Sequence, residues 1–352
     1  MILKVKRHFK IDTFEKFTLL LKYDSVASAF SFSFYFDPEN TKHRLLFQPG
    51  HYHQIDIEHN GELLLRGWIV GQAFGDSAVK VLSSVNGYSL PGVLGDCQIP
   101  VDLYPLQSDT KNLREIAQRF TSKFPFSVQI DGSVASKMEK VYDITTAKDN
   151  DTMSGYLTSL ASQKDIVLSH TNTGDLLFTK AKTRSTPIFH FEKGLESIID
   201  MSLKFNGQMM HSDITVQKQA GIDGGNAGQS NIKNPFVPYV FRPKVVVQNS
   251  GDDNDTEDAA LSVRSAEMKG IVLTIKTSTW ELDGKVIKPN NIITVRNPDL
   301  YLYKKTNWFI ESVKFDGDAT STIATLTCVL PETYNGQTPS YIFEINEEKE
   351  HG

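Results

Sequence analysis

The chain has 352 residues, of which 39% are hydrophobic and 22% charged, a composition typical of a soluble globular protein with two or three domains. Asp and Glu number 42 against 37 Lys and Arg, and the net charge of −5 argues against a basic nucleic-acid-binding surface. Cys97 and Cys328 are too few for a disulfide framework or a cysteine-rich zinc site, so two reduced thiols are favoured over one bridge. The N-terminus has no apolar signal core and no apolar run could span a membrane, which predicts a soluble protein made in a cytoplasm.

Residues 1–87 predict a first small antiparallel β-barrel. Short segments rich in β-branched, aromatic and leucine residues alternate with turn signals such as DPEN, QPG and HNG. Phenylalanine stands at every second position from Phe30 to Phe36, with Ser31, Ser33 and Tyr35 between, and this is the pattern of a half-buried strand.

Residues 88–185 predict an α+β middle domain of helix, strand, helix and hairpin. Ser108 or Asp109 is the expected N-cap of the first helix, and Asp151 or Thr152 that of the second. The hairpin turn is expected at TNTGD, residues 171–175. Apolar residues follow both caps at helical spacing: Leu113, Ile116, Ala117 and Phe120 in the first helix, and Met153, Leu157, Leu160 and Ala161 in the second.

Residues 186–220 and 271–334 predict a second β-barrel. Between them, residues 221–270 form an insertion, expected to be a mobile glycine-rich loop at 221–235 followed by a strand and a helix that pack on the middle domain. Residues 335–352 are a polar C-terminal tail. Together these segments predict a mainly β fold with α+β parts, in which two similar barrels flank an α+β domain.

A repeated pattern links the two predicted barrels. Pro49 and Trp68 are 19 residues apart, and so are Pro289 and Trp308. Each proline precedes a turn-prone residue (Gly50 or Asn290), an alternating strand, a turn and a leucine-rich strand with the tryptophan. A phenylalanine then follows, Phe74 in the first copy and Phe315 in the second, and each copy ends in one more strand. The shared order favours one architecture used twice.

His51 and His53 are the strongest candidates for a metal site, because two positions apart in a strand places both rings on one face. Their counterparts in the second copy, Asn291 and Ile293, include no comparable pair of ligands, and a zinc site needs three or four. Solvated or packed strand histidines are therefore favoured over a metal site. No phosphate loop, calcium loop, GxSxG or paired carboxylates stand out, so we predict no catalytic residues, no cofactor and no metal.

The order of the segments resembles the baseplate hub (tail) proteins of Mu-like phages, which are related to late-control D proteins and to the hub part of type VI secretion spikes. The resemblance lies in the opening strand pair at 14–34, the segment LLFQPGHYHQIDIEHNGELLLRGWIVGQAF, the entry VNGYSLPGVLGDCQIP with the helix NLREIAQRF, and the hairpin module at 151–181. It continues through RPKVVVQNS and its helix to the closing segment at 290–315 and the PETY of residues 331–334. Because the family is diverse in sequence, the resemblance does not extend to the loop at 221–235 or to the last 18 residues.

The resemblance implies a structural protein of the virion tail baseplate, assembled in the host cytoplasm, and not an enzyme. It would be a homotrimer whose two barrels per chain form a ring of six. Its partners would be the tail tube or distal tail proteins, the spike, and possibly the tape-measure protein, with DNA passing a central channel without specific binding and without membrane insertion. A tail-associated cell-wall hydrolase or glycan-binding protein remains the alternative, and a secretion-type injection machine is a third possibility.

Overall fold

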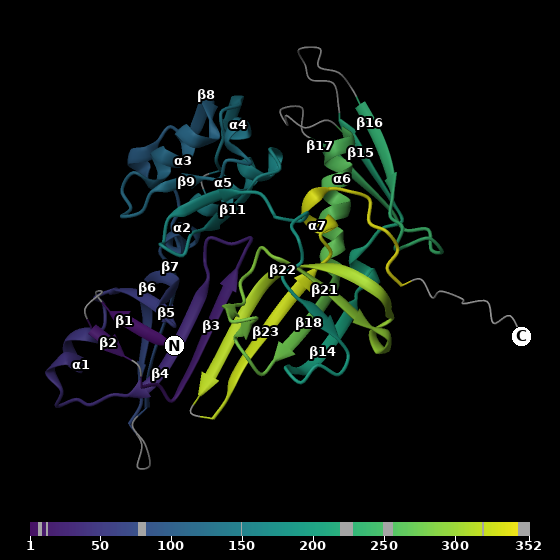
Figure 1. The fold of residues 1–352 in the computed structure, drawn as a ribbon. Helices are drawn as coiled ribbons and strands as arrows, with labels where there is room; N and C mark the ends of the chain where they lie inside the picture. Colours follow the sequence, from purple (N-terminus) through teal and green to yellow (C-terminus); the bar gives the residue numbers. More distant parts are fainter. Residues whose placement is uncertain are drawn as a thin grey trace, which may run out of the picture. The chain divides into compact units, whose positions relative to one another are not determined.

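The computed structural model describes residues 1–5, 9–11, 13–76, 82–148, 150–218, 228–248, 256–318 and 320–343. The chain divides into two compact units, one made of residues 1–180 and 314–323, the other of residues 181–313 and 324–352. Most elements are β-strands in antiparallel sheets (Figure 1), so the predicted mainly β fold with α+β parts is confirmed. In the described part of the chain no sheet closes on itself, and the two expected barrels are open sheets.

The first unit begins with a sheet, here called the N-terminal sheet, whose strand order is β3-β4-β7-β6-β5-β1-β2. Its phenylalanine strand follows the predicted alternation over Phe30, Phe32 and Phe34, which are all buried, whereas Phe36 lies beyond the end of β4 and is half-buried. A short helix, α1 (Thr41–Leu46), follows β4, and the sequence pattern did not predict it. The strands are β1 (Ile2–Val5), β2 (Phe9–Ile11), β3 (Lys16–Lys22), β4 (Ala29–Tyr35), β5 (Gln54–His59), β6 (Glu62–Phe74) and β7 (Leu82–Ser89).

The middle of the first unit is the α+β module that the sequence predicts. The apolar stripes of its two longer helices are buried in one core, as expected. The elements are the short helix α2 (Val93–Asp96), β8 (Gln107–Asn112), α3 (Leu113–Thr121), β9 (Val128–Ile130), α4 (Ala135–Met138), β10 (Val141–Thr146), α5 (Met153–Gln163), β11 (Val167–His170) and β12 (Leu176–Thr179), with 3-10 turns at Leu90–Gly92 and Val101–Leu103.

One helix cap differs from the prediction. Ser108 and Asp109 lie inside β8, where they pair with β10, and so they cannot cap α3. The cap is Asn112, whose side chain accepts a hydrogen bond from the backbone N–H of Glu115 at 2.9 Å. The Glu115 carboxylate in turn accepts from the N–H of Asn112 at 3.1 Å, which completes a capping box. The second predicted cap is correct, because Thr152 Oγ1 accepts from the N–H of Gly155.

The second unit contains the C-terminal sheet, in which β14 (Ile198–Phe205), β18 (Ile271–Thr277), β23 (Thr322–Val329) and β22 (Leu302–Asp318) follow in spatial order. β21 (Ile292–Asn297) pairs with β22, and β13 (His190–Glu192) lies parallel to β21. The end of the β22–β23 hairpin, residues 314–323, belongs to the first unit, where β22 lies next to β3. Smaller elements are β19 (Glu281–Leu282), β20 (Lys285–Val286) and α7 (Glu332–Asn335), with 3-10 turns at Gly207–Met209, Met268–Gly270 and Pro298–Leu300.

The two sheets share one strand order. In the N-terminal sheet, the five consecutive strands β3 to β7 lie side by side in the order β3-β4-β7-β6-β5. Counted from β3 along the chain, this is the order first, second, fifth, fourth, third. The strands β14, β18, β21, β22 and β23 lie in the same order, and the neighbouring strands whose pairing is described are antiparallel in both sheets. The repeat suggested by the sequence therefore has a topological counterpart.

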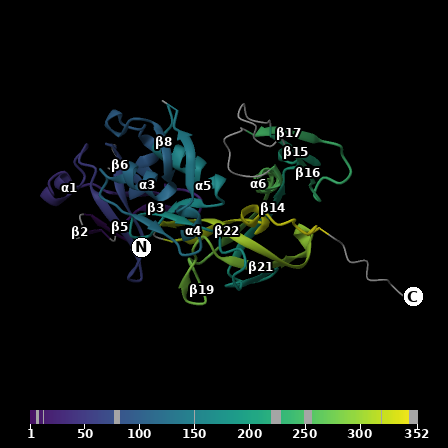
Figure 2. The same cartoon turned by 90° about the horizontal axis from the view of Figure 1, so that it is seen from above.

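A separate three-stranded sheet completes the second unit, with strand order β16-β15-β17 and the helix α6 (Thr256–Glu267) against one face (Figure 2). It is made of β15 (Asp213–Lys218), β16 (Gly228–Lys233) and β17 (Pro243–Gln248). Thus β15, assigned from sequence to the second barrel, pairs here instead. The predicted loop 221–235 contains β16, and its residues 221–227 lie outside the described part.

Candidate functional site

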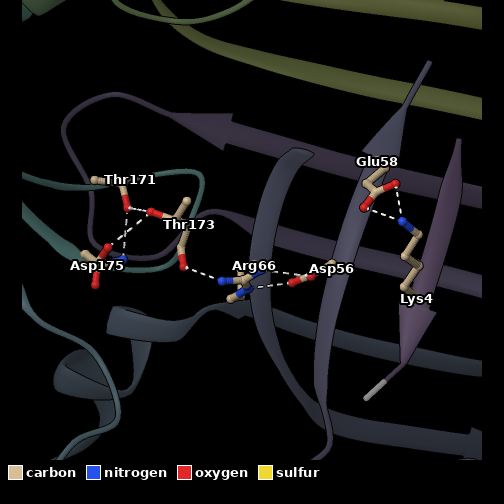
Figure 3. A network of polar contacts seen from close by, with 7 residues as sticks. All are labelled: Lys4, Asp56, Glu58, Arg66, Thr171, Thr173 and Asp175. Atoms are coloured by element: carbon tan, nitrogen blue, oxygen red, sulfur yellow. Dashed lines mark hydrogen bonds and ion pairs between the residues drawn. The ribbon is translucent and has the colours of Figure 1, made fainter. Parts of the chain in front are cut away.

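Arg66 forms the centre of a polar network in the first unit (Figure 3). Its Nε and Nη2 donate to the two carboxylate oxygens of Asp56 at 2.6 and 3.0 Å, and its Nη1 donates to the carbonyl of Thr173 at 3.4 Å. The hydrogen bond to Asp56 raises the pKa of the Arg66 guanidinium, against the opposing effect of burial. On the same sheet Lys4 and Glu58 form an ion pair at 2.6 Å. Arg66 thus ties β5 and β6 to the turn at 171–175.

The turn itself is held by Asp175. Its carboxylate accepts hydrogen bonds from the N–H and hydroxyl of Ser127, from the amide of Gln129 and from the hydroxyl of Thr173. Burial alone would raise the pKa of Asp175, but these hydrogen bonds outweigh it and lower the pKa below its usual value. The predicted TNTGD turn is therefore fixed within the middle module by Asp175, and the contact of Arg66 with the Thr173 carbonyl joins it to the N-terminal sheet.

A buried serine and a half-buried histidine make a second link in the first unit. His170 Nε2 lies 2.6 Å from Ser28 Oγ, and its Nδ1 lies 3.1 Å from the carbonyl of Thr171. Because a carbonyl only accepts, Nδ1 carries the proton and Nε2 accepts from the Ser28 hydroxyl. Ser28 is fully buried and also accepts from the N–H of Lys22, so its hydroxyl is not accessible to a substrate, whereas His170 is half-buried. The contact is structural.

His51 and His53 do not lie on a strand, contrary to the prediction, because β5 begins only at Gln54. Their rings are 5.3 Å apart, His51 is exposed, and His53 Nε2 lies 3.1 Å from the carbonyl of Leu45. His53 is therefore a packed side chain beside α1. Across the residues that the structure describes, no group of three His, Cys, Asp or Glu side chains could hold a metal ion.

The two copies of the repeated segment begin with similar turns. Gly50, after the exposed Pro49, has a φ of +82°, and Asn290, after Pro289, has a φ of +63°. Both residues thus adopt the left-handed conformation that glycine and asparagine tolerate best. Each turn leads into a strand that pairs with the tryptophan-bearing strand.

The two tryptophans are not equivalent within their sheets. Trp68 stands opposite Gln54, five residues after Pro49, whereas Trp308 stands opposite Ile293, four residues after Pro289. A shift of one residue reverses the face to which a side chain points. Accordingly Trp308 is fully buried and Trp68 only half-buried. The phenylalanines differ in the same sense, because Phe315 is fully buried and Phe74 is 45% exposed.

The PETY segment, residues 331–334, forms most of α7 and contacts other residues of the second unit. The Tyr334 hydroxyl donates to the carboxylate of Glu311 at 2.6 Å, and its ring lies 5.0 Å from that of Phe309. Lys269 pairs with Glu311 at 3.0 Å and lies over the Tyr334 ring. Burial raises the pKa of Glu332 in the same segment.

A cavity of about 590 Å³ lies beside this segment within the second unit. Its lining includes Arg184, Lys304, Lys305, Glu332 and Tyr341. These are mixed polar side chains, cationic and acidic, with one aromatic ring. Cys97 and Cys328 are free thiols, and among the described residues no helix is both long and apolar enough to cross a membrane.

No protein-family model and no curated protein matches the sequence. Solved structures do match over nearly the whole chain. The 43 kDa tail protein of prophage MuSo2 from Shewanella oneidensis is 18% identical, with a TM-score of 0.78 over 95% of this chain and 99% of that one. A tail protein from Neisseria meningitidis is 17% identical, with a TM-score of 0.77 over 96% and 98%.

A more distant match is a component of the type VI secretion system of E. coli, described as similar in structure to bacteriophage tail proteins. It is 9% identical, with a TM-score of 0.59 over 97% of this chain and 80% of that one. At these identities the likeness concerns the fold. The chain therefore has the fold found in prophage tail proteins and in a type VI secretion component.

Proposed function

We propose that this protein is the structural baseplate hub of a contractile phage tail or phage-like particle. In this proposal it is a homotrimer that joins the six-fold tail tube to the three-fold spike. The observation that carries the proposal is the presence of two sheets with one strand order in a single chain. The similarity in fold to prophage tail proteins supports it.

The physical reason is symmetry. Contacts between protein rings repeat according to the symmetry of each ring, so a plain trimer offers a six-fold tube only three equal positions. A chain that carries the same sheet twice offers six similar positions from three copies. The remaining parts of the chain, which are not repeated, keep three-fold symmetry and can receive a trimeric spike.

The partners follow from this role. They are the spike on one face, the tail tube or distal tail proteins on the other, and the tape-measure protein in the central channel. DNA would pass the channel without specific binding, because a net charge of −5 disfavours retention of phosphate. The protein would be assembled in the host cytoplasm and remain in the virion baseplate.

The alternative, a cell-wall hydrolase or glycan-binding protein, gains no support from the contact between Ser28 and His170, because the Ser28 hydroxyl is buried. A hub in a secretion-type machine would use the same trimer, and the neighbouring genes would distinguish the two.

Native mass spectrometry over a range of concentrations tests the proposal, together with electron microscopy of the particle viewed down its axis. We expect a species of three times 39.5 kDa and a ring with six similar lobes around an open centre. A strict monomer at the highest attainable concentration, or a ring without six similar lobes, would contradict the proposal.

A further inference from the structure

β14 is an edge strand whose apolar face is only partly covered by the described part of its own chain: the Phe205 ring lies near those of Phe236 and Phe343, and Asn297 donates to the Met201 sulfur. Its only strand partner in the described part is β18. Apolar and polar residues alternate along it, which is the pattern of a strand with one buried face. None of the apolar residues is buried, however: Ile199 is 52% exposed, Phe205 is 45% exposed, and Met201 and Leu203 are half-buried.

The equivalent strand of the N-terminal sheet, β3, is covered. Phe17, Leu19 and Leu21 are at most 6% exposed. Its second edge lies next to the end of β22, in the part of that strand which belongs to the first unit. There the Thr18 hydroxyl donates to Asp316 at 2.7 Å, and Phe315 is fully buried. The end of one hairpin thus occupies the position that is open on β14.

The other sheet has a hairpin of the same kind. β6 pairs with β5 only as far as Trp68, and residues 70–74 continue beside β7 alone. On the side away from β7, no strand of the described chain pairs with these residues. Phe74 and Leu82 stand at this end, 45% and 39% exposed. The described residues of this hairpin end, 70–74 and Leu82, therefore present an open backbone edge and partly exposed apolar side chains.

We propose that the end of the β6–β7 hairpin of one copy docks on the β14 edge of a second copy. This inference rests on the proposed homotrimer and identifies the surfaces that build it. The proposed contact of β6 with β14 is based on the contact of the β22 end with β3. β6 and β22 occupy equivalent places in the shared strand order, and so do β14 and β3. Main-chain hydrogen bonds along the edge would give affinity, and apolar side chains would give register.

A contact between two different surfaces is heterologous, so copies add head to tail until the ring closes. Closure at three copies gives six sheet-to-sheet contacts of one kind, three within chains and three between them. This explains why Phe315 is buried and Phe74 is exposed in the single chain: the first has its partner within the chain, and the second meets its partner only in the assembly.

Two single variants test the surfaces. Ile199→Glu places a charge on the β14 edge, and Phe74→Glu places one on the hairpin end. Leu82→Glu is a second hairpin variant, used if the loss of the contact between Phe74 and Phe36 impairs folding. Val101→Glu is the control, because Val101 is 78% exposed and lies outside both surfaces. Sedimentation velocity measures the assembly, and circular dichroism checks that each variant is folded.

We expect wild type and Val101→Glu to form trimers, and each edge variant alone to be at least about tenfold weaker in self-association, which corresponds to 1.4 kcal/mol. An equimolar mixture of Ile199→Glu and Phe74→Glu retains one intact contact and is expected to stop at a heterodimer. Folded edge variants that still form trimers would overturn the assignment of these surfaces and leave the hub proposal standing. A monomeric wild type would overturn both.

Discussion

At the scale of single residues, Arg66 carries an interaction that the sequence did not single out. Asp56 is buried, and its charge is matched by a bidentate contact from Arg66. Removal of the guanidinium leaves that carboxylate desolvated and unpaired. Arg66→Ala is therefore expected to lower the free energy of unfolding by about 3 kcal/mol, measured by urea denaturation.

Arg114→Ala is the matched control. Arg114 also pairs with a carboxylate at 2.6 Å, that of Glu139, but both side chains are well exposed. Exposed pairs contribute at most about 1 kcal/mol, so this variant should remain close to wild type. Equal losses in the two variants would refute the view that burial of Asp56 makes the Arg66 contact important.

His170 gives the first unit a sensitivity to acid. Burial lowers the pKa of its imidazole, whereas the unfolded chain takes up the proton near the ordinary value of 6.5. Below that value the unfolded state binds more protons than the folded state, so stability is present above about pH 6.5 and is lost as the pH falls.

The measurement is the free energy of unfolding at about pH 7.5 and about pH 5.5 in wild type and in His170→Gln. Wild type is expected to lose more stability between the two values than the variant, which has no imidazole at this position. The same loss in both proteins would assign the acid sensitivity to other groups.

At the scale of elements, the close pairing of β6 with β7 depends on a glycine. A Cβ placed on Gly87 would lie 1.8 Å from the carbonyl oxygen of Trp68 in the neighbouring strand. The two backbones would have to separate, which breaks part of the ladder. Gly87→Ala is expected to cost about 3 kcal/mol of stability and to lower the melting temperature.

Gly132→Ala serves as its control, because a Cβ at Gly132 meets no atom within 4 Å. This variant should unfold close to wild type. If Gly87→Ala were equally well tolerated, the close approach of β6 and β7 would not be a constraint on the fold.

The sequence predicted the elements best where one side-chain period runs for several residues. The phenylalanine strand β4 and the stripes of α3 and α5 are buried as expected. It failed where local signals compete. Ser108 and Asp109 are good caps in isolation, but pairing of β8 with β10 moved the helix start to Asn112. The helix α1 is too short for a periodic pattern to indicate it.

At the scale of the whole molecule, the candidate surfaces come from a comparison that the sequence alone does not permit. Apolar residues alternate with other residues in both β3 and β14, and the two strands occupy the same position in the shared strand order. One of them is buried and the other is exposed. Since the two strands occupy the same place in one topology, the difference supports the proposal that a second copy covers β14.

The sequence by itself determined that the chain is mainly β, that an α+β module stands in its middle, and that a proline-to-tryptophan segment occurs twice. These features depend on local periodicity and spacing, which are properties of the linear chain. The tertiary structure decided the register that separates Trp68 from Trp308, the pairing of β15 with β16 and β17, and the exposure of β14. An alternating strand requires a cover for its apolar face, but the residue that provides the cover is distant in sequence, so only the folded chain shows which faces remain open.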